Sequence, residues 1–404
     1  MKAGHLPGLE GLRLDTELST FQDILSFYLA TPERVRNIGK KIVAKSPLTP
    51  PEIIFAAGAL PYDISTYENM TLSMLENRTN LTHEAVEAGI SPELNPWQLI
   101  LLGSELNGHG AIPADMYAAA VGGFDDQLTK TFQVIARAKS LPVRFVEVPR
   151  FEESARSWAM SYLEKELLQF IEWLELRTRQ RVTNESLHEA ITDTNQIRRD
   201  MTTLDGFLSG TKLPLNALEY YLLQAPIGDF GQDPKKLHQL FLSLFKELQA
   251  RLDNGYSLSG VATSPTRLYM MGDMTQELSL FNAIENSGGC LVGCDFRFSL
   301  YYDLISDDIP PLTAFAQWIW SMPVNLPVAK RVKNQVEAIK KQRPDAVIIN
   351  SSVGSRNLPG AERLVRDILK EELGVPILTL ETTLPGETTE KVDYQVRAFL
   401  EMMR

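Results

Sequence analysis

Apolar and polar residues follow two periodicities along this chain, and the first region has the helical one. Apolar residues recur at helical spacing on one face of residues 16–45, from Phe21 to Leu29. A helix with one apolar face buries that face against another part of the protein. We therefore expect residues 1–48 to form a helical cover that packs on a neighbouring domain.

Residues 49–150 combine helical and strand patterns. The segment "PPEIIFAAGALP" (50–61) is apolar and helical, with an end expected at Gly58 and Pro61. Two short apolar runs, "MYAAAVGG" and "LPVRFVEVP", are typical of buried parallel strands, and the sequence between them has the helical period. These patterns predict a βαβ unit within a small α/β domain over 49–150.

Long helical patterns fill residues 151–255, where Thr183 or Asn184 can cap the second helix and Gly255 can end the third. After Gly255, four short apolar runs alternate with helical stretches: "TRLYMMGD", "GCLVGCD", "DAVIINSS" and "VPILTLE". This alternation predicts a helical insert followed by a second α/β domain over 256–404, built on a parallel, doubly wound sheet. The predicted fold class is α/β, with two parallel-sheet domains, N-terminal helices and a helical insert.

Ligands of doubly wound sheets bind beyond the carboxyl ends of the strands. The residues that the pattern places there are Gly272, Asp273, Asp295, Ser351, Ser352 and Glu381. The turn "SSVGSRN" follows one strand and precedes a helix, so that Gly354, Ser355 and Arg356 can offer amide and guanidinium donors to an anion. A plain connecting loop is the alternative interpretation of this turn.

Charge and hydropathy exclude several classes of protein. The 404 residues include 51 acidic and 40 basic side chains, a net charge of −11, which argues against binding to nucleic acid or to anionic membranes. No apolar run is long enough to span a bilayer, and the first residues lack the apolar segment of a signal peptide. We expect a cytoplasmic protein that binds neither nucleic acid nor membrane.

The sequence contains two cysteines, Cys290 and Cys294, within one predicted strand. Two thiols are too few for a structural zinc site or a cubane cluster, so strand packing is the favoured interpretation. The histidines show no metal-binding spacing, and no metal site is expected in this chain. His109 lies between two glycines in "ELNGHGAIP", where it can face a ligand. Neither GxGxxG nor a "GKS" or "GKT" motif occurs, which argues against dinucleotide and ATP sites.

Several segments, taken in order, carry a family resemblance. They are "PPEIIFAAGALP", "LHEAITDTNQIRRDM" with its N..R spacing of Asn195 and Arg198, "DAVIINSSVGSR" and "GVPILTLETTLPGE". Together they resemble the D-component subunits of 2-hydroxyacyl-CoA dehydratases and the related benzoyl-CoA reductases, over roughly residues 45–404. The resemblance implies two Rossmann-like domains and an acyl-CoA or aryl-CoA thioester as substrate.

The resemblance also implies partners and a cofactor. Subunits of this family pair with a sister subunit, three cysteines of one subunit bind a [4Fe-4S] cluster, and an ATP-dependent activator protein supplies an electron. The three cluster positions fall at Asn95, Phe124 and Ser355 in this sequence, so none of them carries a cysteine. The resemblance therefore implies a clusterless subunit that shapes a thioester pocket, while a cysteine-bearing sister subunit holds the [4Fe-4S] cluster.

Candidate roles follow for particular residues. Glu52 and His109 are candidates for moving the proton that a radical elimination must release, although Glu52 can equally be a carboxylate that stabilises a helix N-terminus. The turn residues Ser351, Ser352, Ser355 and Arg356 are the candidates for substrate binding. Two alternatives stay open: a noncatalytic acyl-CoA-binding or assembly subunit, and a metal-free enzyme that uses Asp295, Arg297 and this same turn.

Overall fold

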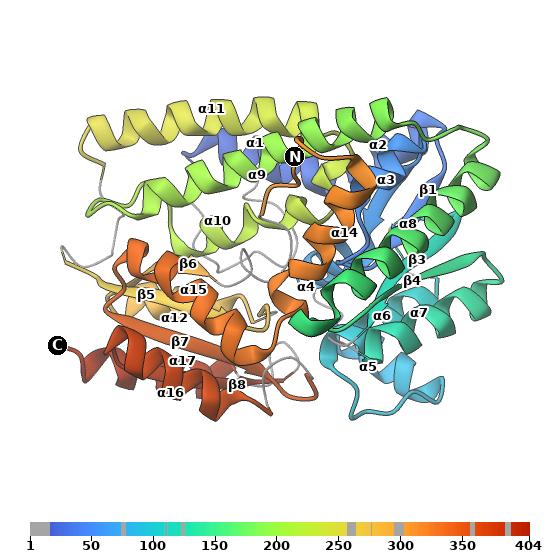
Figure 1. The fold of residues 1–404 in the computed structure, drawn as a ribbon. Coiled ribbons are helices and arrows are strands. Elements are labelled where there is room, and N and C mark those ends of the chain that lie inside the picture. Colours follow the sequence, from blue (N-terminus) through green and yellow to red (C-terminus); the bar gives the residue numbers. More distant parts are fainter. Residues whose placement is uncertain are drawn as a thin grey trace.

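The computed structural model describes residues 17–73, 78–108, 110, 112–122, 126–256, 264–275, 277–294, 303–355, 360–383 and 389–404. These residues form two four-stranded parallel sheets. The α/β class with two parallel-sheet domains is the one that the sequence predicts. N-terminal helices and a group of long helices accompany the sheets (Figure 1). In this part of the chain, no helix is long and apolar enough to cross a membrane.

The first sheet has the strand order β2-β1-β3-β4. Its strands are β1 (Ile42–Lys45), β2 (Leu60–Asp63), β3 (Met116–Gly122) and β4 (Val143–Val148). Strands β3 and β4 confirm the predicted βαβ unit. The expectation of continuous helix over 16–45 is wrong at its C-terminal end, because helices α1 (Ser19–Leu29) and α2 (Thr31–Ile38) stop before β1. Gly39, with φ of 70°, ends α2 and releases the chain into the strand.

Strand β2 was also not predicted. Helix α3 (Pro51–Ala56) is shorter than the apolar segment 50–61, and Gly58 follows it with φ of 70°, a conformation that favours glycine. The remaining residues of the segment then begin β2, which is paired in parallel with β1. Both β1 and β2 are buried along their whole length and have only four residues each, too few to reveal a strand period.

The second sheet has the order β6-β5-β7-β8, and its four strands are those that the sequence predicts. They are β5 (Thr266–Gly272), β6 (Gly289–Cys294), β7 (Ala346–Ser352) and β8 (Ile377–Thr382). In each sheet, the strand that comes first in the sequence lies between the second and the third. The two sheets therefore share one topology, with a topological switch point between β1 and β3 and another between β5 and β7.

Helices surround both sheets. Those of the first half are α4 (Ile64–Ser73), α5 (Arg78–Glu87), α6 (Pro96–Leu106) and α7 (Asp126–Lys139). The helical segment contains α8 (Arg156–Thr178), α9 (Asn184–Leu208), α10 (Ala217–Leu222) and α11 (Pro234–Asp253). The second half adds α12 (Ser279–Asn286), α14 (Pro311–Ser321), α15 (Val328–Gln342), α16 (Glu362–Leu373) and α17 (Thr389–Glu401). Thr183 caps α9, as predicted, in a capping box with Ser186.

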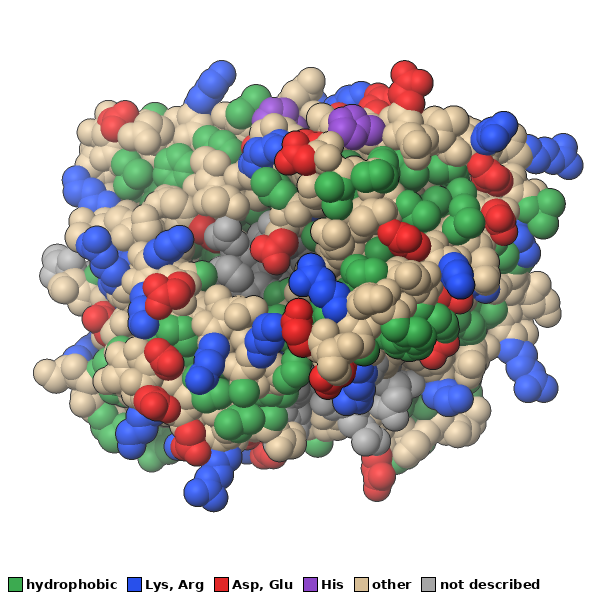
Figure 2. All heavy atoms as spheres, in the orientation of Figure 1, with side chains coloured by type: hydrophobic (Ala, Val, Ile, Leu, Met, Phe, Trp, Pro, Cys, Tyr) green, Lys and Arg blue, Asp and Glu red, His purple; other side chains and the backbone are tan. Residues whose placement is uncertain are grey.

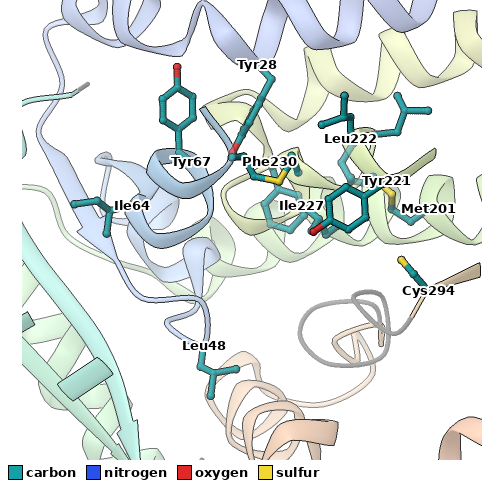
Figure 3. Close-up of a cluster of buried hydrophobic side chains, with 14 of the residues drawn as sticks. Tyr28, Leu48, Ile64, Tyr67, Met201, Tyr221, Leu222, Ile227, Phe230 and Cys294 are labelled. Atoms are coloured by element: carbon teal, nitrogen blue, oxygen red, sulfur yellow. The ribbon is translucent and has the colours of Figure 1, made fainter. Parts of the chain in front are cut away.

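One large hydrophobic core joins the two halves through the helical segment. Figure 3 shows part of it, where Tyr28 of α1, Met201 of α9, Phe230 and Cys294 of β6 gather in one cluster. Helix α14, from the second half of the chain, packs beside α8 (Figure 1). Because burial of shared apolar surface opposes separation, these contacts hold the halves in a fixed relation. The domain boundaries at 48, 150 and 255 stay predictions.

Candidate functional site

The first polar cluster lies at the switch point of the second sheet. Asp273 follows β5, and its Oδ2 accepts a hydrogen bond from the backbone N–H of Ser352 at 3.0 Å. Its Oδ1 accepts from Ser355 Oγ at 3.0 Å. The side chains of Ser351, Ser352 and Ser355 are almost completely buried. One carboxylate thus fixes the turn after β7 against the end of β5, where doubly wound sheets bind ligands.

The first half contributes the N-terminus of α6 to the same place. Asn95 caps this helix, its Oδ1 accepting from the N–H of Trp97 at 2.9 Å. The N–H of Asn95 donates to Gln127 Oε1 at 3.1 Å, and Gln127 Nε2 donates to the carbonyl of Gly354 at 3.1 Å. Gly354 is so close that an added Cβ would lie 3.2 Å from Asn95 Cα. Gln127 therefore ties α6 to the turn after β7.

Two of the three family cluster positions are consequently neighbours in space. Asn95 lies against Gly354, the residue before Ser355, at the junction of the two halves, whereas Phe124 lies outside the described residues. The groups at the two described positions are an amide and a hydroxyl, and both are used in hydrogen bonds. An iron–sulfur cluster is held by soft, anionic thiolates. These side chains therefore do not fit a [4Fe-4S] cluster.

The two cysteines lie elsewhere, within β6. Both are buried, and burial raises the pKa of the Cys290 thiol to about 12. Gln224 Nε2 donates to Cys294 Sγ at 3.2 Å. Across the described ranges, no group of three or more His, Cys, Asp or Glu side chains is placed to hold a metal ion. The described contacts of Cys290 and Cys294 are those of strand-packing residues.

Glu52 lies in the first turn of α3, fully buried, and its environment was not predicted. Arg198 Nη2 of α9 donates to Glu52 Oε1 at 2.6 Å, and neither side chain is exposed. The guanidinium carbon lies over the rings of Phe230 and Trp318, 5.2 and 4.9 Å from their centroids. Asn195 is the other residue of the N..R motif. Its Nδ2 donates to the carbonyl of Ile305 at 2.7 Å, and its Oδ1 accepts from the N–H of Ile305 at 3.0 Å. The motif thus joins α9 to both halves.

A further charged cluster, missed by the sequence analysis, lies where β1 and β2 end. Lys45 Nζ is 3.3 Å from Asp63 Oδ2, with both side chains buried. The N–H of Asp63 donates to Asp229 Oδ2 at 3.0 Å. Burial, and then the charge of Asp63, raise the pKa of Asp229 to about 7. This cluster was missed because the two strands that carry it were missed.

The remaining predicted residues are divided between the surface and undescribed segments. Glu381 is exposed in β8, with Lys391 Nζ 3.4 Å from its carboxylate. Four candidate residues lie outside the described part of the chain: His109, Asp295, Arg297 and Arg356. Their roles stay predictions, as does proton transfer by Glu52.

The fold and the site together define a class of protein. It has two doubly wound halves, and the N-terminus of α6 in the first half lies against the turn after β7 in the second. A family model described as 2-hydroxyglutaryl-CoA dehydratase, D-component, matches residues 48–403. The chain belongs to this family, and the resemblance inferred from its motifs is confirmed. No curated protein matches the chain.

Proposed function

We propose that this chain is the clusterless subunit of a heteromeric 2-hydroxyacyl-CoA dehydratase or benzoyl-CoA reductase-type enzyme. The observation that carries the proposal is the convergence of Asn95 and Ser355 at the junction of the two halves. The family fold is present, while the side chains at these cluster positions are an amide and a hydroxyl. A cysteine-bearing sister subunit would then hold the [4Fe-4S] cluster, and an ATP-dependent activator protein would reduce it.

The part of this chain in such an enzyme is to bind and orient an acyl-CoA or aryl-CoA thioester. The turn that carries Ser351, Ser352, Ser355 and Arg356 offers hydroxyl, amide and guanidinium donors to thioester or phosphate oxygens. Asp273 supports this role because it fixes the turn before any ligand arrives, which lowers the entropy lost on binding. Glu52 and His109 remain the candidates for moving a proton, and a cytoplasmic location fits this assembly.

Anaerobic purification tests this proposal. The chain is isolated under native conditions from its own cells, and the copurifying chains are identified by mass spectrometry. Iron and acid-labile sulfide are then assayed, and the EPR spectrum of the reduced sample is recorded. We expect a cysteine-rich sister subunit in equal amount, with the cluster lost when that subunit is removed. A metal-free homodimer would instead support the noncatalytic binding role, and a cluster on the isolated chain would refute the proposal.

A further inference from the structure

A groove of about 840 Å³ opens away from the junction site. Helices α2, α3, α9 and α11 line it, together with the turn that precedes α11. Of the described residues, neither cluster position (Asn95, Ser355) and no residue of the turn after β7 is among those that line it. The groove is therefore a separate feature, and its interpretation does not depend on the proposed function.

Two long helices direct their N-termini at this groove. Ser186 from the first turn of α9 and Lys236 from the first turn of α11 both line it. These helices have 25 and 20 residues, so each carries a full macrodipole with a partial positive charge of about half a unit at this end. Both ends favour a negatively charged ligand between them.

A buried donor in the groove wall has no acceptor. Gln232 is 5% exposed, and its Nε2 has no hydrogen-bond partner. Arg34 Nε is likewise buried without a partner, while the ring of Phe27, 3.9 Å from the guanidinium carbon, holds the side chain in place. A buried polar group without a hydrogen-bond partner is unfavourable. A ligand oxygen that reaches these N–H groups removes that penalty, which an apolar ligand cannot do.

The backbone around Gln232 supports a binding role. Phe230 and Gln232 both have positive φ, 54° and 58°, on either side of Gly231. A non-glycine residue in this conformation is strained, and such strain is concentrated at ligand-binding sites. The strained turn brings the Gln232 side chain to the groove wall, and Arg34 Nη2 donates to the carbonyl of Gly231 at 2.9 Å.

The charged side chains of the groove leave positive charge unmatched. Glu189 and Asp193 both contact Lys235 Nζ, at 3.0 and 3.3 Å. Asp233 caps α11, accepting from the backbone N–H of Lys236 at 3.0 Å. Among the described residues, the ammonium groups of Lys40 and Lys236 form no ion pair. Figure 2 shows acidic and basic side chains interspersed on the face drawn.

The groove also has an apolar wall. Ile38 is 47% exposed there, and Phe55 and Ala56 of α3 line the same side. We propose that the groove binds a phosphate monoester that carries an apolar or planar group, with the phosphate near Lys40, Lys236 and the two helix N-termini. The apolar group lies against Ile38 and Phe55. A nucleotide and a smaller aryl phosphate share this chemistry.

Calorimetric titration of the full chain tests the proposal, with phenyl phosphate, ADP and inorganic phosphate as probes. We expect both organic phosphates to bind more tightly than inorganic phosphate, at least threefold, because the latter has no apolar group. The double variant Lys40→Gln/Lys236→Gln should weaken phenyl phosphate binding at least tenfold. Lys246→Gln is the matched control, because Lys246 is exposed on the same helix outside the groove, and its Kd should stay within twofold of the original.

Each outcome decides the proposal. Binding of ADP at least threefold tighter than phenyl phosphate, with the same sensitivity to the two lysines, assigns the groove to nucleotides, and equal binding assigns it to aryl phosphates in general. If the double variant binds ADP with unchanged affinity, the nucleotide binds at another site, such as the thioester pocket. Absence of phenyl phosphate binding at millimolar concentration, or binding that the double variant leaves unchanged, overturns the proposal.

Discussion

The two α/β halves have the same strand order and treat their polar groups differently. In the first half, ionisable side chains are buried in and around the sheet, and Lys45, Asp63 and Glu52 are each 0–1% exposed. At the switch point of the second half, one carboxylate, Asp273, holds a turn of neutral hydroxyl and amide groups. A shared topology thus fixes where polar groups gather and leaves their chemistry open.

The difference between the halves also suggests that they contribute differently to the stability of the fold and to the proposed binding of a ligand. The buried Glu52 has a charged partner from the helical segment, Arg198. The backbone N–H of the buried Asp63 donates to Asp229, which also belongs to that segment. These contacts connect parts of the chain that are distant in sequence. Breaking one partner of such a pair leaves an uncompensated buried charge. The turn of the second half is held by hydrogen bonds to Asp273 and Gln127, and we propose that it binds a ligand. We therefore expect substitutions in the first half to affect folding most.

The largest effect should come from Arg198→Met. The substitution leaves the fully buried Glu52 carboxylate without its cation, and removing one partner of a buried pair lowers the free energy of unfolding by about 3–5 kcal/mol. Urea denaturation measures this change. The double variant Glu52→Gln/Arg198→Met is the control, and it should be more stable than Arg198→Met alone because no buried charge remains. A loss below about 1 kcal/mol in the single variant would contradict this view of the first half.

Asp229→Asn should change how stability depends on pH. The pKa of Asp229 is raised to about 7, while an unfolded aspartate titrates near 4. Between about pH 4 and 7 the folded protein binds more protons than the unfolded chain, so Asp229 lowers the free energy of unfolding as the pH rises. Over this window, the stability of the original protein relative to the variant should fall by on the order of 3–4 kcal/mol.

Urea denaturation at a series of pH values measures this difference. Asp307→Asn is the matched control, because Asp307 is an exposed aspartate that forms no ion pair within the described part of the chain. Its stability relative to the original protein should be constant from pH 4 to pH 7. A flat difference for Asp229→Asn as well would show that Asp229 is ionised in the folded protein across the whole range.

Local pattern predicts the second half better than the first. Strands β5 to β8 are apolar runs of six or seven residues between helices, and their ends gave Asp273 and the turn after β7 directly. Strands β1 and β2 have four residues each, and each contains a charged residue, Lys45 or Asp63, that is buried. Charged residues are usually exposed, so a charged residue in a short apolar run indicates a surface segment. The hydrophobic pattern therefore does not predict these two buried strands.

The sequence predicted the site only where the site depends on motifs and short apolar runs, which are local features of the chain. Motifs gave Asn95 and Ser355 as cluster positions without cysteine, yet their proximity depends on Gln127, which reaches from α7 to Gly354. The contact of Glu52 with Arg198 likewise joins two distant helices. Such tertiary contacts leave no periodic signal in either segment, because neither side chain alone indicates its partner.

In the second half, Asp273→Asn should have a moderate effect. The asparagine keeps one acceptor oxygen and places an N–H₂ group where the other oxygen accepted from Ser352 or Ser355. Hydrogen bonds to a charged acceptor contribute about 1.5–3 kcal/mol, and partial replacement should therefore cost about 1–2 kcal/mol in urea denaturation. Affinity for an acyl-CoA, measured by calorimetry, should fall more than stability does. A loss of stability equal to that of Arg198→Met would remove the proposed difference between the halves.

The smallest effect should come from a surface ion pair of the second half. Asp393 and Arg397 form an i, i+4 pair on α17, with about half of each side chain exposed. Exposed pairs of this kind contribute roughly 0.3–0.5 kcal/mol, because solvent and salt screen the attraction. Asp393→Asn should thus change the free energy of unfolding by no more than about 0.5 kcal/mol, and less at high salt. A larger loss would mean that charge stabilises both halves, and that burial is not what distinguishes the first.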